Sequence, residues 1–320
     1  MEENIFQGME YVYEVYRQGS FQKAAEKLFI SQPSVSASVR RAEERAGCCL
    51  FDRSMKPLQL TECGRHYIDA VERIMAVEHE FSEFVNDRNG LKRGSLVLGG
   101  SSMFSSLVLP PLMGEFRKRY PDISLELVEE TTVNLEEMLL KGSIDIMFDY
   151  ESAGSSAFTG EFFEEDRMIL SVPKAFVDKN RLGKYLLDPA EISKAGAIGV
   201  PAVPLSEFEN MPFVLLKPAN DSRRRARQIC ADYGFEPNVI MEFDQQMTAY
   251  LASCSGIGIS FTGSLLISRT APNPDVCCFL LDGPHSRRNV CVFKKRGRYT
   301  TGAAKAFIEL ARENTVRKSG

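Results

Sequence analysis

The sequence lacks the residue clusters and motifs on which catalytic and metal sites are usually built. It has no tryptophan and only three histidines, His66, His79 and His285, which are too scattered to predict a metal site or a histidine-dependent hydrolytic centre. It has no Gly-x-x-x-x-Gly-Lys-Ser/Thr phosphate loop, and Gly99 and Gly100 do not have the spacing of a dinucleotide fingerprint. We therefore expect no catalytic residues, no metal and no cofactor, and we do not expect an enzyme.

Long apolar runs and paired cysteine motifs are also missing. No run approaches the ~20 apolar residues of a membrane span, and residues 1–8 have no apolar signal-peptide segment, so we expect a cytoplasmic location. The eight cysteines show no Cys-x-x-Cys pair, which predicts reduced and mostly buried thiols. The neighbouring pairs Cys48-Cys49 and Cys277-Cys278 are weak evidence for a redox sensor, because adjacent thiols cannot bridge without strain.

The composition is that of a folded protein with more than one domain. With 320 residues, 44% hydrophobic and 26% charged, the chain can bury several cores, and two or three domains are expected. The net charge is -4, so the whole molecule is not attracted to nucleic acid. A small excess of basic side chains between residues 20 and 60 can only act locally.

Residues 20–40 predict two helices joined by a tight turn. Ser20 and Ser31 stand at the expected N-caps, and Pro33 lies in the first turn of the second helix, where its missing N–H costs nothing. The polar face of this second helix carries Gln32, Ser34, Ser36 and Arg40. Such a face suits the major groove, where Gln pairs with adenine and Ser with either base. Serine-capped hairpins also occur in proteins that do not bind DNA, so the hairpin alone leaves both interpretations open.

Residues 64–90 predict one long helix that ends at Asn89-Gly90. Apolar residues recur along it at alternating spacings of four and three, with Glu78 as the one polar interruption. The stripe consists of Tyr67, Val71, Ile74, Phe81 and Val85. It predicts a short coiled-coil seam between two copies of the chain. The alternative is that the stripe packs on the adjacent domain.

Residues 95–149 alternate strand and helix, and residues 168–261 repeat that alternation, so two α/β lobes are expected. Because ligands bind at the carboxyl ends of parallel strands, a binding cleft should lie between the lobes. The segment from residue 276 to residue 313 is expected to return to the first lobe. Ser101 and Ser102 follow the first strand, where their hydroxyls would face the cleft, although a simple helix cap explains them nearly as well.

The spacing of residues 24–64 resembles the winged helix-turn-helix of LysR-type transcriptional regulators. The matching positions are Ala24, Ala25, Leu28, Ser31, Gln32, Pro33, Val35, Ser36, Val39, Glu43, Gly47, Leu50, Phe51, Arg53, Leu60, Thr61 and Gly64. The resemblance implies a wing at about residues 53–60. It also implies base contacts by Gln32, Pro33 and Ser36 and phosphate contacts by Ser20, Arg53 and Lys56. Ala42 and Ala46 stand where the family usually has Leu, which predicts lighter core packing.

The rest of the chain resembles the effector-binding domain of the same family, a relative of periplasmic binding proteins. Residues 109–112, 116–121, 139–145 and 256–259 match in order. Besides Ser101 and Ser102, the resemblance implies ligand contacts by Thr131, Asn220 and Thr262, and Lys217 would add a charge. Residues 223–225, three consecutive arginines, are expected to form a solvated helix face. Residues 176–206 are longer than the usual connection.

The expected fold is α/β, with a winged helix-turn-helix over residues 1–63, a linker and dimerisation helix over 64–90, and a two-lobed periplasmic-binding-protein-like effector domain over 91–320. Lobe I would comprise residues 91–162 and 266–320, and lobe II residues 163–265. The leading hypothesis is a transcription regulator that binds double-stranded DNA as a homodimer or dimer of dimers. Its promoter binding would be modulated by a small-molecule effector in the cleft, with an anionic group favoured.

The alternative hypothesis is a small-molecule binding protein or enzyme on the same two-lobed scaffold, with the helical hairpin used only for assembly. An export signal or a clustered catalytic set would favour this alternative, and the sequence contains neither. No membrane partner is expected under either hypothesis.

Overall fold

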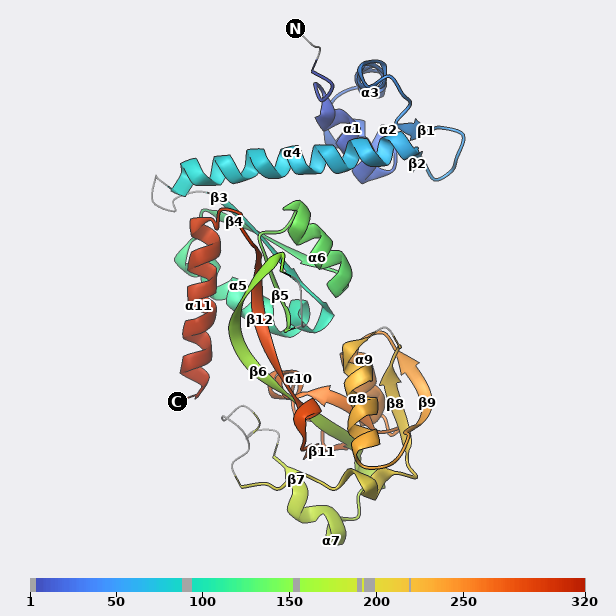
Figure 1. The fold of residues 1–320 in the computed structure, drawn as a ribbon, viewed down its shortest axis with the longest axis vertical. Coiled ribbons are helices and arrows are strands. Elements are labelled where there is room, and N and C mark those ends of the chain that lie inside the picture. The colour runs from blue at the N-terminus through green and yellow to red at the C-terminus, as the bar shows by residue number, and fades with distance from the viewer. Residues whose placement is uncertain are drawn as a thin grey trace. The chain divides into compact units, whose positions relative to one another are not determined.

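The computed structural model describes residues 4–87, 94–151, 156–188, 192, 199–218 and 220–319. They form two compact units, residues 1–82 with 141–143 and residues 83–140 with 144–320 (Figure 1). We call these the N-terminal unit and the C-terminal unit. Among the described residues, no helix is long and apolar enough to span a membrane. The helix end expected at Asn89-Gly90 lies outside the described residues.

The N-terminal unit is a small helical bundle with a β-hairpin. Its first helices are α1 (Met9–Gln18), α2 (Phe21–Lys27) and α3 (Gln32–Ala46). The antiparallel strands β1 (Phe51–Asp52) and β2 (Gln59–Leu60) follow, and the loop between them is the wing. The long helix α4 (Glu62–Asp87) begins directly after β2, capped by the Thr61 hydroxyl, which accepts the Gly64 N–H at 2.9 Å.

The helix caps expected from the sequence are present. The Ser20 hydroxyl accepts the Lys23 N–H at 3.4 Å, and the Ser31 hydroxyl accepts the Ser34 N–H at 3.3 Å. α3 ends at Gly47, whose φ of 71° is a conformation that favours glycine. The buried core of the unit consists of Val12, Val15, Ala24, Ala25, Val35, Val39, Ala42, Leu50, Phe51, Tyr67, Ile68 and Val71.

The C-terminal unit is built on a sheet with the strand order β4-β3-β5-β12-β6-β11-β7, and β10 also pairs with β6. β3 (Gly94–Gly100), β4 (Ile123–Glu129) and β5 (Ile146–Tyr150) are parallel, whereas β12 (Arg287–Lys295) and β6 (Phe158–Pro173) run antiparallel to their neighbours. The other strands of this sheet are β7 (Leu186–Leu187), β10 (Ser260–Gly263) and β11 (Val276–Leu280). β8 (Pro212–Leu216) and β9 (Asn238–Phe243) form a separate parallel pair.

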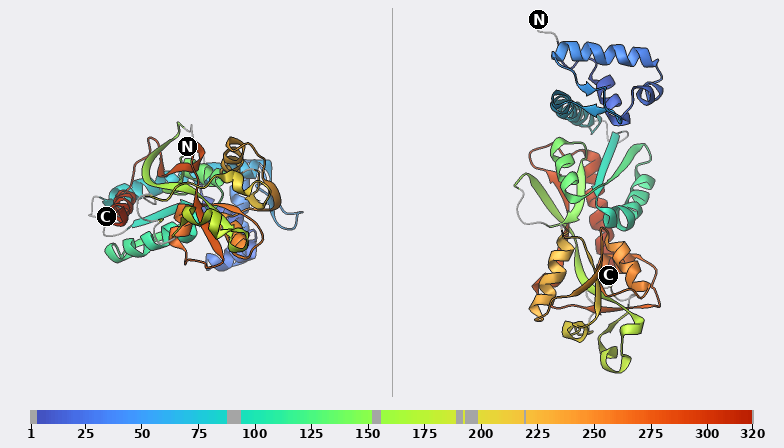
Figure 2. Two further views of the ribbon diagram at one scale, coloured as in Figure 1. Left: turned by 90° about the horizontal axis from the view of Figure 1, so that it is seen from below. Right: turned by 90° about the vertical axis from the view of Figure 1, so that its right-hand side faces the viewer.

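The long strand β6 belongs to two lobes. Residues 158–167 of β6 pair with β12 in lobe I, and residues 168–173 pair with β10 and β11 in lobe II. In lobe I, α5 (Leu109–Arg119) and α11 (Gly302–Ser319) pack on one sheet face and α6 (Thr132–Lys141) on the other (Figures 1 and 2). Lobe II carries α7 (Lys179–Leu182), α8 (Asp221–Asp232), α9 (Gln246–Cys254) and α10 (Ser264–Arg269).

The expected return of residues 276–281 to lobe I is wrong. β11 pairs with residues 169–173 of β6, and Phe279 packs against Phe208 in the core of lobe II, with ring centroids 5.7 Å apart. The second half of β6 has two edges of backbone polar groups, and β10 and β11 satisfy one edge each. Because β11 could not leave without exposing one of these edges, the chain returns to lobe I only at β12.

The long segment over residues 176–206 extends lobe II as far as it is described. It contributes α7 and the short strand β7, which pairs with β11 at the edge of the sheet. Residues 189–191 and 193–198 of this segment lie outside the described residues.

Candidate functional site

The polar face of α3 is exposed from its first residue. Gln32, Pro33 and Ser34 lie at the surface, whereas Val35 and Val39 are fully buried on the opposite side. Gln32 Nε2 donates to Ser36 Oγ at 2.9 Å, so the two side chains are already held side by side on this face. The remaining Gln32 amide N–H and its carbonyl oxygen stay available to a base edge.

Other residues expected to contact DNA lie at the starts of α2 and α3 and further along α3. The Ser20 oxygen accepts a backbone N–H as the cap of α2, which leaves its hydroxyl hydrogen available for a phosphate. The Ser31 and Ser34 hydroxyls lie 2.7 Å apart at the exposed start of α3. Arg40, two turns further along α3, forms an ion pair with exposed Glu44 at 3.3 Å.

Glu43, which the sequence offered only as one matching position of the resemblance, positions the wing. Its Oε1 accepts the Leu50 and Phe51 backbone N–H groups at 2.9 and 3.4 Å. Its Oε2 accepts Arg53 Nη2 at 3.0 Å. The partly buried carboxylate of Glu43 therefore holds both the start of β1 and Arg53 of the wing.

Arg53 and Lys56, the two expected phosphate ligands of the wing, differ in their surroundings. The Arg53 guanidinium pairs with Glu43 and lies over the Phe21 ring, 5.1 Å from its centroid. Lys56 is exposed in the loop between β1 and β2. Arg53 thus has a structural role besides any phosphate contact, because it bonds across the unit.

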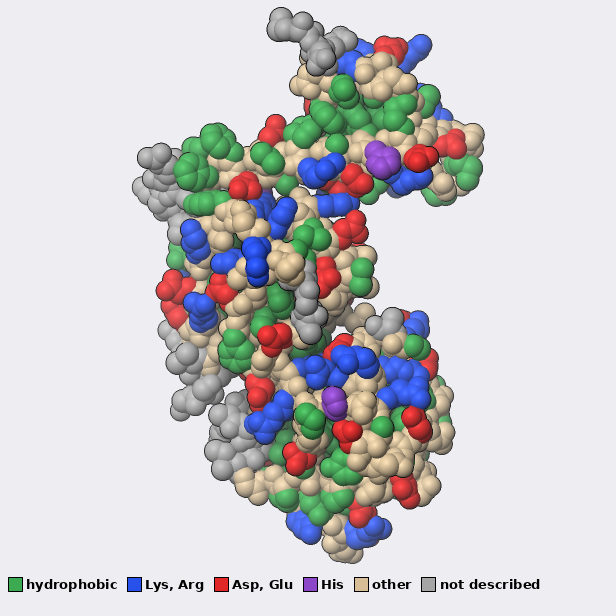
Figure 3. Space-filling model, in the orientation of Figure 1, with side chains coloured by type: hydrophobic (Ala, Val, Ile, Leu, Met, Phe, Trp, Pro, Cys, Tyr) green, Lys and Arg blue, Asp and Glu red, His purple; other side chains and the backbone are tan. Residues whose placement is uncertain are grey.

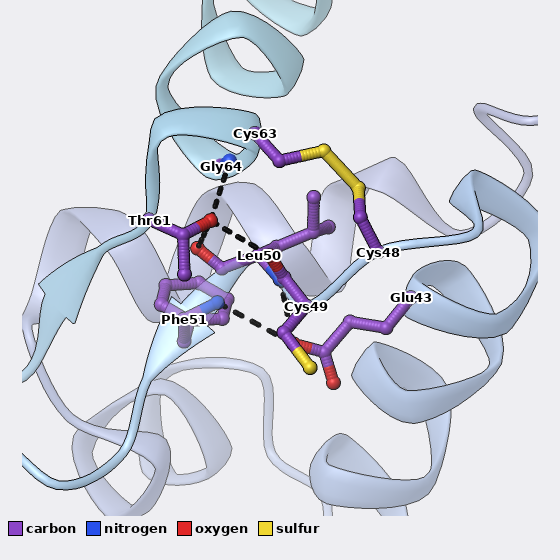
Figure 4. The surroundings of a disulfide bond; sticks show 8 residues. All are labelled: Glu43, Cys48, Cys49, Leu50, Phe51, Thr61, Cys63 and Gly64. Atoms are coloured by element: carbon purple, nitrogen blue, oxygen red, sulfur yellow. Dashed lines mark hydrogen bonds between the residues drawn. A yellow bond between two sulfur atoms is a disulfide. The ribbon is translucent and has the colours of Figure 1, made fainter.

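The expectation of reduced thiols is wrong for two cysteines. Cys48, just after α3, and Cys63, in the first turn of α4, form a disulfide across 15 residues of sequence, with Cα atoms 6.7 Å apart (Figure 4). The partner of Cys48 is therefore not its neighbour Cys49, whose sulfur points away from the bond (Figure 4). The other cysteines are free, and they are Cys49, Cys230, Cys254, Cys277, Cys278 and Cys291.

The stripe expected to form the dimer seam is divided between two roles. Tyr67 and Val71 are only 6% and 0% exposed because they pack in the core of the N-terminal unit, so they do not face a second copy. Further along α4, Phe81 is 67% exposed and Val85 43% exposed. Figure 3 shows hydrophobic side chains at the surface along this part of the helix.

An open apolar groove accompanies the exposed stretch of α4. It has a volume of about 440 Å³ and is lined by Phe6, Ala70, Arg73, Ile74, Val77 and Glu78. Val77 is 67% exposed and was not part of the expected stripe. The spacing of four between Val77 and Phe81 could have suggested it, once Tyr67 and Val71 are assigned to the core.

The expected effector contacts of lobe I lie where β3 and β4 end. Ser101 and Ser102 are partly buried directly after β3, and the Ser101 carbonyl accepts the Ser105 N–H at 2.9 Å as the helical turns begin. Thr131 is exposed at the start of α6, where its hydroxyl accepts the Asn134 N–H at 3.4 Å. All three are thus brought to the carboxyl end of the parallel strands, as expected.

The residues of lobe II that were expected to contact the effector differ in their exposure and in their partners. Asn220 caps α8, since its Oδ1 accepts the Ser222 N–H at 2.9 Å, and exposed Lys217 pairs with Asp244 at 2.8 Å. The ligand contact expected for Thr262 is wrong. This residue is 0% exposed inside the sheet, and its hydroxyl lies 2.7 Å from Ser171 Oγ. A side chain enclosed in this way cannot contact a ligand in the cleft.

The three consecutive arginines of α8 are not a uniformly solvated face. Figure 3 shows Lys and Arg side chains gathered over this helix. The Arg224 side chain is 73% exposed, but those of Arg223 and Arg225 are only 11% and 18% exposed. Arg223 Nη1 donates to the Leu216 carbonyl at 2.8 Å, so it is used within lobe II.

A buried ion pair that the sequence did not predict lies where β6 and β12 pass between the lobes. Arg288 donates to Asp166 Oδ2 through Nε at 3.0 Å and Nη2 at 2.8 Å. Tyr150, at the end of β5 in lobe I, donates its hydroxyl to the same oxygen at 2.9 Å, and the guanidinium lies 3.5 Å from its ring centroid. In lobe II, Ser222 of α8 accepts Arg288 Nη1 at 2.8 Å. The pair therefore connects both lobes.

The Asp166 carboxylate of the ion pair is hydrogen-bonded at both oxygens and tightly packed. Asp166 Oδ1 accepts the Ser264 hydroxyl and the Leu265 N–H, each at 2.9 Å. A Cβ on Gly263 would lie 2.5 Å from Asp166, so the carboxylate needs a glycine beside it. Burial raises the pKa of the Tyr150 hydroxyl well above its usual value, which keeps it a hydrogen-bond donor. In the sequence, Asp166 stands in a run of charged residues in β6 and Arg288 follows Arg287 at the start of β12, so nothing marked either side chain as buried or as the partner of the other.

The region also contains a buried carboxyl group and no recognisable metal ligands. Burial raises the pKa of Asp149, although the carboxylate accepts the Thr132 hydroxyl at 2.7 Å. Across the described ranges, no group of three or more His, Cys, Asp and Glu side chains is arranged to hold a metal ion.

Comparisons with known proteins match both units. The model of the bacterial regulatory helix-turn-helix protein, lysR family, matches residues 6–65. The model of the LysR substrate binding domain matches residues 89–316, which is well over half of the chain.

Individual proteins resemble the whole chain or a part of it. It is 32% identical to the HTH-type transcriptional regulator YcgK of Bacillus subtilis, over 96% of this chain and 93% of that protein. It is 38% identical to a probable RuBisCO transcriptional regulator of Cyanidioschyzon merolae, over 40% of this chain and 43% of that protein. Among solved structures, CbnR, a LysR family transcriptional regulator, has a TM-score of 0.68 at 17% identity, covering 98% of this chain and 99% of CbnR. This last likeness shows the fold alone.

Proposed function

This chain belongs to the LysR family of DNA-binding transcriptional regulators, a non-enzymatic family, and from that premise we propose how its two units work together. The first turn of α3 reads bases, the wing contacts phosphates, and two copies pair through α4. A small polar metabolite with an anionic group binds between the lobes of the C-terminal unit and changes the affinity for a promoter site. The protein acts in the cytoplasm as a homodimer or a dimer of dimers.

The exposed first turn of α3 is the observation that carries the DNA part of the proposal. Gln32 and Ser36 are joined at 2.9 Å on the surface, while the same helix buries Val35 and Val39. A helix that is anchored on one side and carries short polar groups at its free N-terminus fits the major groove, where amide and hydroxyl groups distinguish base edges.

Paired binding is supported by the apolar surface of α4. Ile74 lines the open groove, and Val77 and Phe81 are each 67% exposed. Neighbouring apolar side chains at this exposure are costly in a helix that has no further partner, and a second α4 would cover them. Two copies of α3 would then face two half-sites of one DNA duplex.

Effector binding between the lobes is supported by the polar groups at the strand ends. Ser101 and Ser102 start the helical turns after β3, and Asn220 starts α8, so two helix N-termini support an anion in the cleft, although the Asn220 side chain already accepts the Ser222 N–H. Helix N-termini favour anions. Lys217 would add positive charge only after release from Asp244.

Thermal-shift screening of the full-length protein tests the effector assignment. A metabolite with an anionic group should raise the unfolding temperature, because a ligand that binds only the folded state stabilises it by RT ln(1 + [L]/Kd). Ser101→Ala and Ser102→Val should abolish the shift. The control Ser255→Ala should leave it unchanged, because exposed Ser255 follows α9 and donates its hydroxyl to the Leu251 carbonyl of that helix. Stabilisation by apolar or cationic compounds only, or a shift that survives both substitutions, would contradict the assignment.

A further inference from the structure

The disulfide closes the covalent loop that contains the entire wing. Cys48 follows the glycine that ends α3, and Cys63 lies in the first turn of α4. The segment between the two cysteines, which are 15 positions apart in the sequence, includes β1, the wing loop and β2. Any change at this bond is therefore transmitted to both ends of the wing and to the junction of α3 with α4.

Noncovalent contacts hold the same junction without the bond. The Thr61 hydroxyl donates to the Cys49 carbonyl at 2.7 Å and accepts the Gly64 N–H at 2.9 Å (Figure 4). A Cβ on Gly64 would lie 2.0 Å from the Leu50 carbonyl oxygen, which shows how closely α4 approaches the segment after α3. The unit therefore has the contacts to stay folded when the disulfide is open, and the bond adds constraint to the wing.

The two cysteines of the disulfide are not fully buried. Cys48 and Cys63 both lie partly buried at the edge of the core, so neither residue is enclosed in it. In the compartment where a bacterial regulator meets DNA, dithiol reductants keep most thiols reduced, and disulfides that occur there are usually transient or redox-sensing. A bond of this kind would be formed and opened during the life of the protein.

The free cysteines of the C-terminal unit are poor competitors for this chemistry. Burial raises the pKa of Cys230 and of Cys278 to about 12, so that neither forms a thiolate at neutral pH. Burial also raises the pKa of Cys254, Cys277 and Cys291. Cys49 is exposed, but its sulfur points away from the disulfide (Figure 4).

We propose that Cys48 and Cys63 form a site of reversible oxidation that sets the affinity of this regulator for its DNA site. In the oxidised protein the closed loop holds the wing, with Arg53 and Lys56, in the geometry that meets the phosphates. In the reduced protein the wing has more freedom, and binding must order it. Oxidation therefore strengthens DNA binding and reduction weakens it. The inference rests on the proposed contact of the wing with phosphates.

The reaction balances as thiol–disulfide exchange. In the oxidising direction, the two cysteine thiols transfer two electrons and two protons to a low-molecular-weight disulfide, which becomes two thiols. In the reducing direction, a dithiol attacks one cysteine sulfur, forms a mixed disulfide with it and releases the other cysteine, which takes up a proton. The second thiol of the reductant then displaces the first cysteine, leaving two cysteine thiols and an oxidised dithiol.

The test follows the bond and the DNA affinity in one titration. Full-length protein is equilibrated with stepped ratios of reduced to oxidised dithiothreitol, and the fraction of the Cys48–Cys63 disulfide is measured by alkylation and mass spectrometry. The DNA probe is a duplex selected from a randomised library by the oxidised protein. Full reduction should raise the Kd about three- to tenfold, the range expected for ordering one rotamer-rich wing side chain. The two curves should have the same midpoint.

Matched variants separate the disulfide from general effects of reductant. Cys49→Ser should behave as the unsubstituted protein. Cys48→Ser/Cys63→Ser should bind the duplex with the affinity of the reduced protein at every ratio, and circular dichroism reports whether it is folded. If this variant does not fold, the shared midpoint in the unsubstituted protein and in Cys49→Ser decides the question.

Two results would overturn the inference, and they are distinguishable from a failure of the proposed function. A Kd that stays constant while the bond opens, or a folded double variant that still responds to the reductant, removes the redox role and leaves DNA binding intact. If the oxidised protein selects no duplex at all, both the redox role and the proposed base readout by α3 are wrong.

Discussion

Arg288 Nη2 lies 2.8 Å from Asp166 Oδ2, and both side chains are 0% exposed. They come from β12 and β6, the two strands by which the chain passes between the lobes. Tyr150 in lobe I and Ser222 in lobe II share the pair through hydrogen bonds of 2.9 and 2.8 Å. The buried charge pair therefore bonds to both of the lobes that form the proposed cleft.

Removing one member of this pair should be strongly destabilising. Arg288→Ala leaves Asp166 as an uncompensated buried charge, and we expect a loss of about 3–5 kcal/mol in the free energy of unfolding, measured by urea denaturation. Arg224→Ala is the control, because Arg224 is 73% exposed and pairs with Asp221 at the surface. The control should cost less than about 1 kcal/mol. Equal losses in the two variants would show that breaking the buried pair costs no more stability than breaking a surface pair.

Gln32→Ala tests the proposed base readout by α3. The substitution removes the amide but keeps the helix and its caps, so we expect a loss of about 1–3 kcal/mol of discrimination at one base pair. Non-specific affinity for unrelated DNA should stay nearly the same. The measurement is a competition binding assay with duplexes altered at single positions, and an unchanged base preference would refute the assignment of Gln32.

The two wing cations should respond differently to removal. Lys56→Ala should weaken binding to all sequences alike and reduce the slope of log Kd against log salt by about 0.9, as expected for one phosphate contact. Arg53→Ala should do the same and should also lower folding stability, because Arg53 bonds to Glu43 at 3.0 Å and lies over Phe21. Thermal unfolding of both variants provides the comparison. Equal stabilities would mean that the Glu43 contact is unimportant.

Charge substitutions along α4 should separate its two roles. Phe81→Asp changes a side chain that is 67% exposed in one chain, so the monomer should stay folded while the dimer dissociates and specific DNA binding is lost. Val71→Asp changes a residue that is 0% exposed in the core, so it should unfold the N-terminal unit instead. Sedimentation and circular dichroism distinguish these outcomes. A Phe81→Asp protein that remains dimeric would exclude this surface as the seam.

Local features of the fold could be predicted because their causes lie within a few residues. Ser20 and Ser31 cap the helices that they precede, each through a backbone N–H three residues on. The order of strand and helix from β3 to β5 likewise follows from short apolar patterns separated by turns. Such signals require no knowledge of what packs against the segment.

Burial along α4 and in β10 could not be predicted in the same way. The apolar stripe was correct as a helical pattern, but Tyr67 and Val71 face their own unit while Phe81 faces solvent. Thr262 was expected to follow a strand and contact a ligand, yet it lies within β10, opposite Ile169 of β6, and is 0% exposed. A periodic pattern identifies a face without identifying its neighbour.

By itself, the sequence determined the family, the order of the elements and the exposed polar turn of α3, since these depend on near neighbours and on many positions in register. Only the tertiary structure decided that Cys48 bonds to Cys63 instead of Cys49, that Arg288 meets Asp166 across 122 residues, and that β11 remains in lobe II. These outcomes depend on which distant backbones approach closely enough for a short bond or a shared strand edge. The energy of such contacts falls steeply with distance, so the approach of the chains, and not the residue types alone, selects the partner.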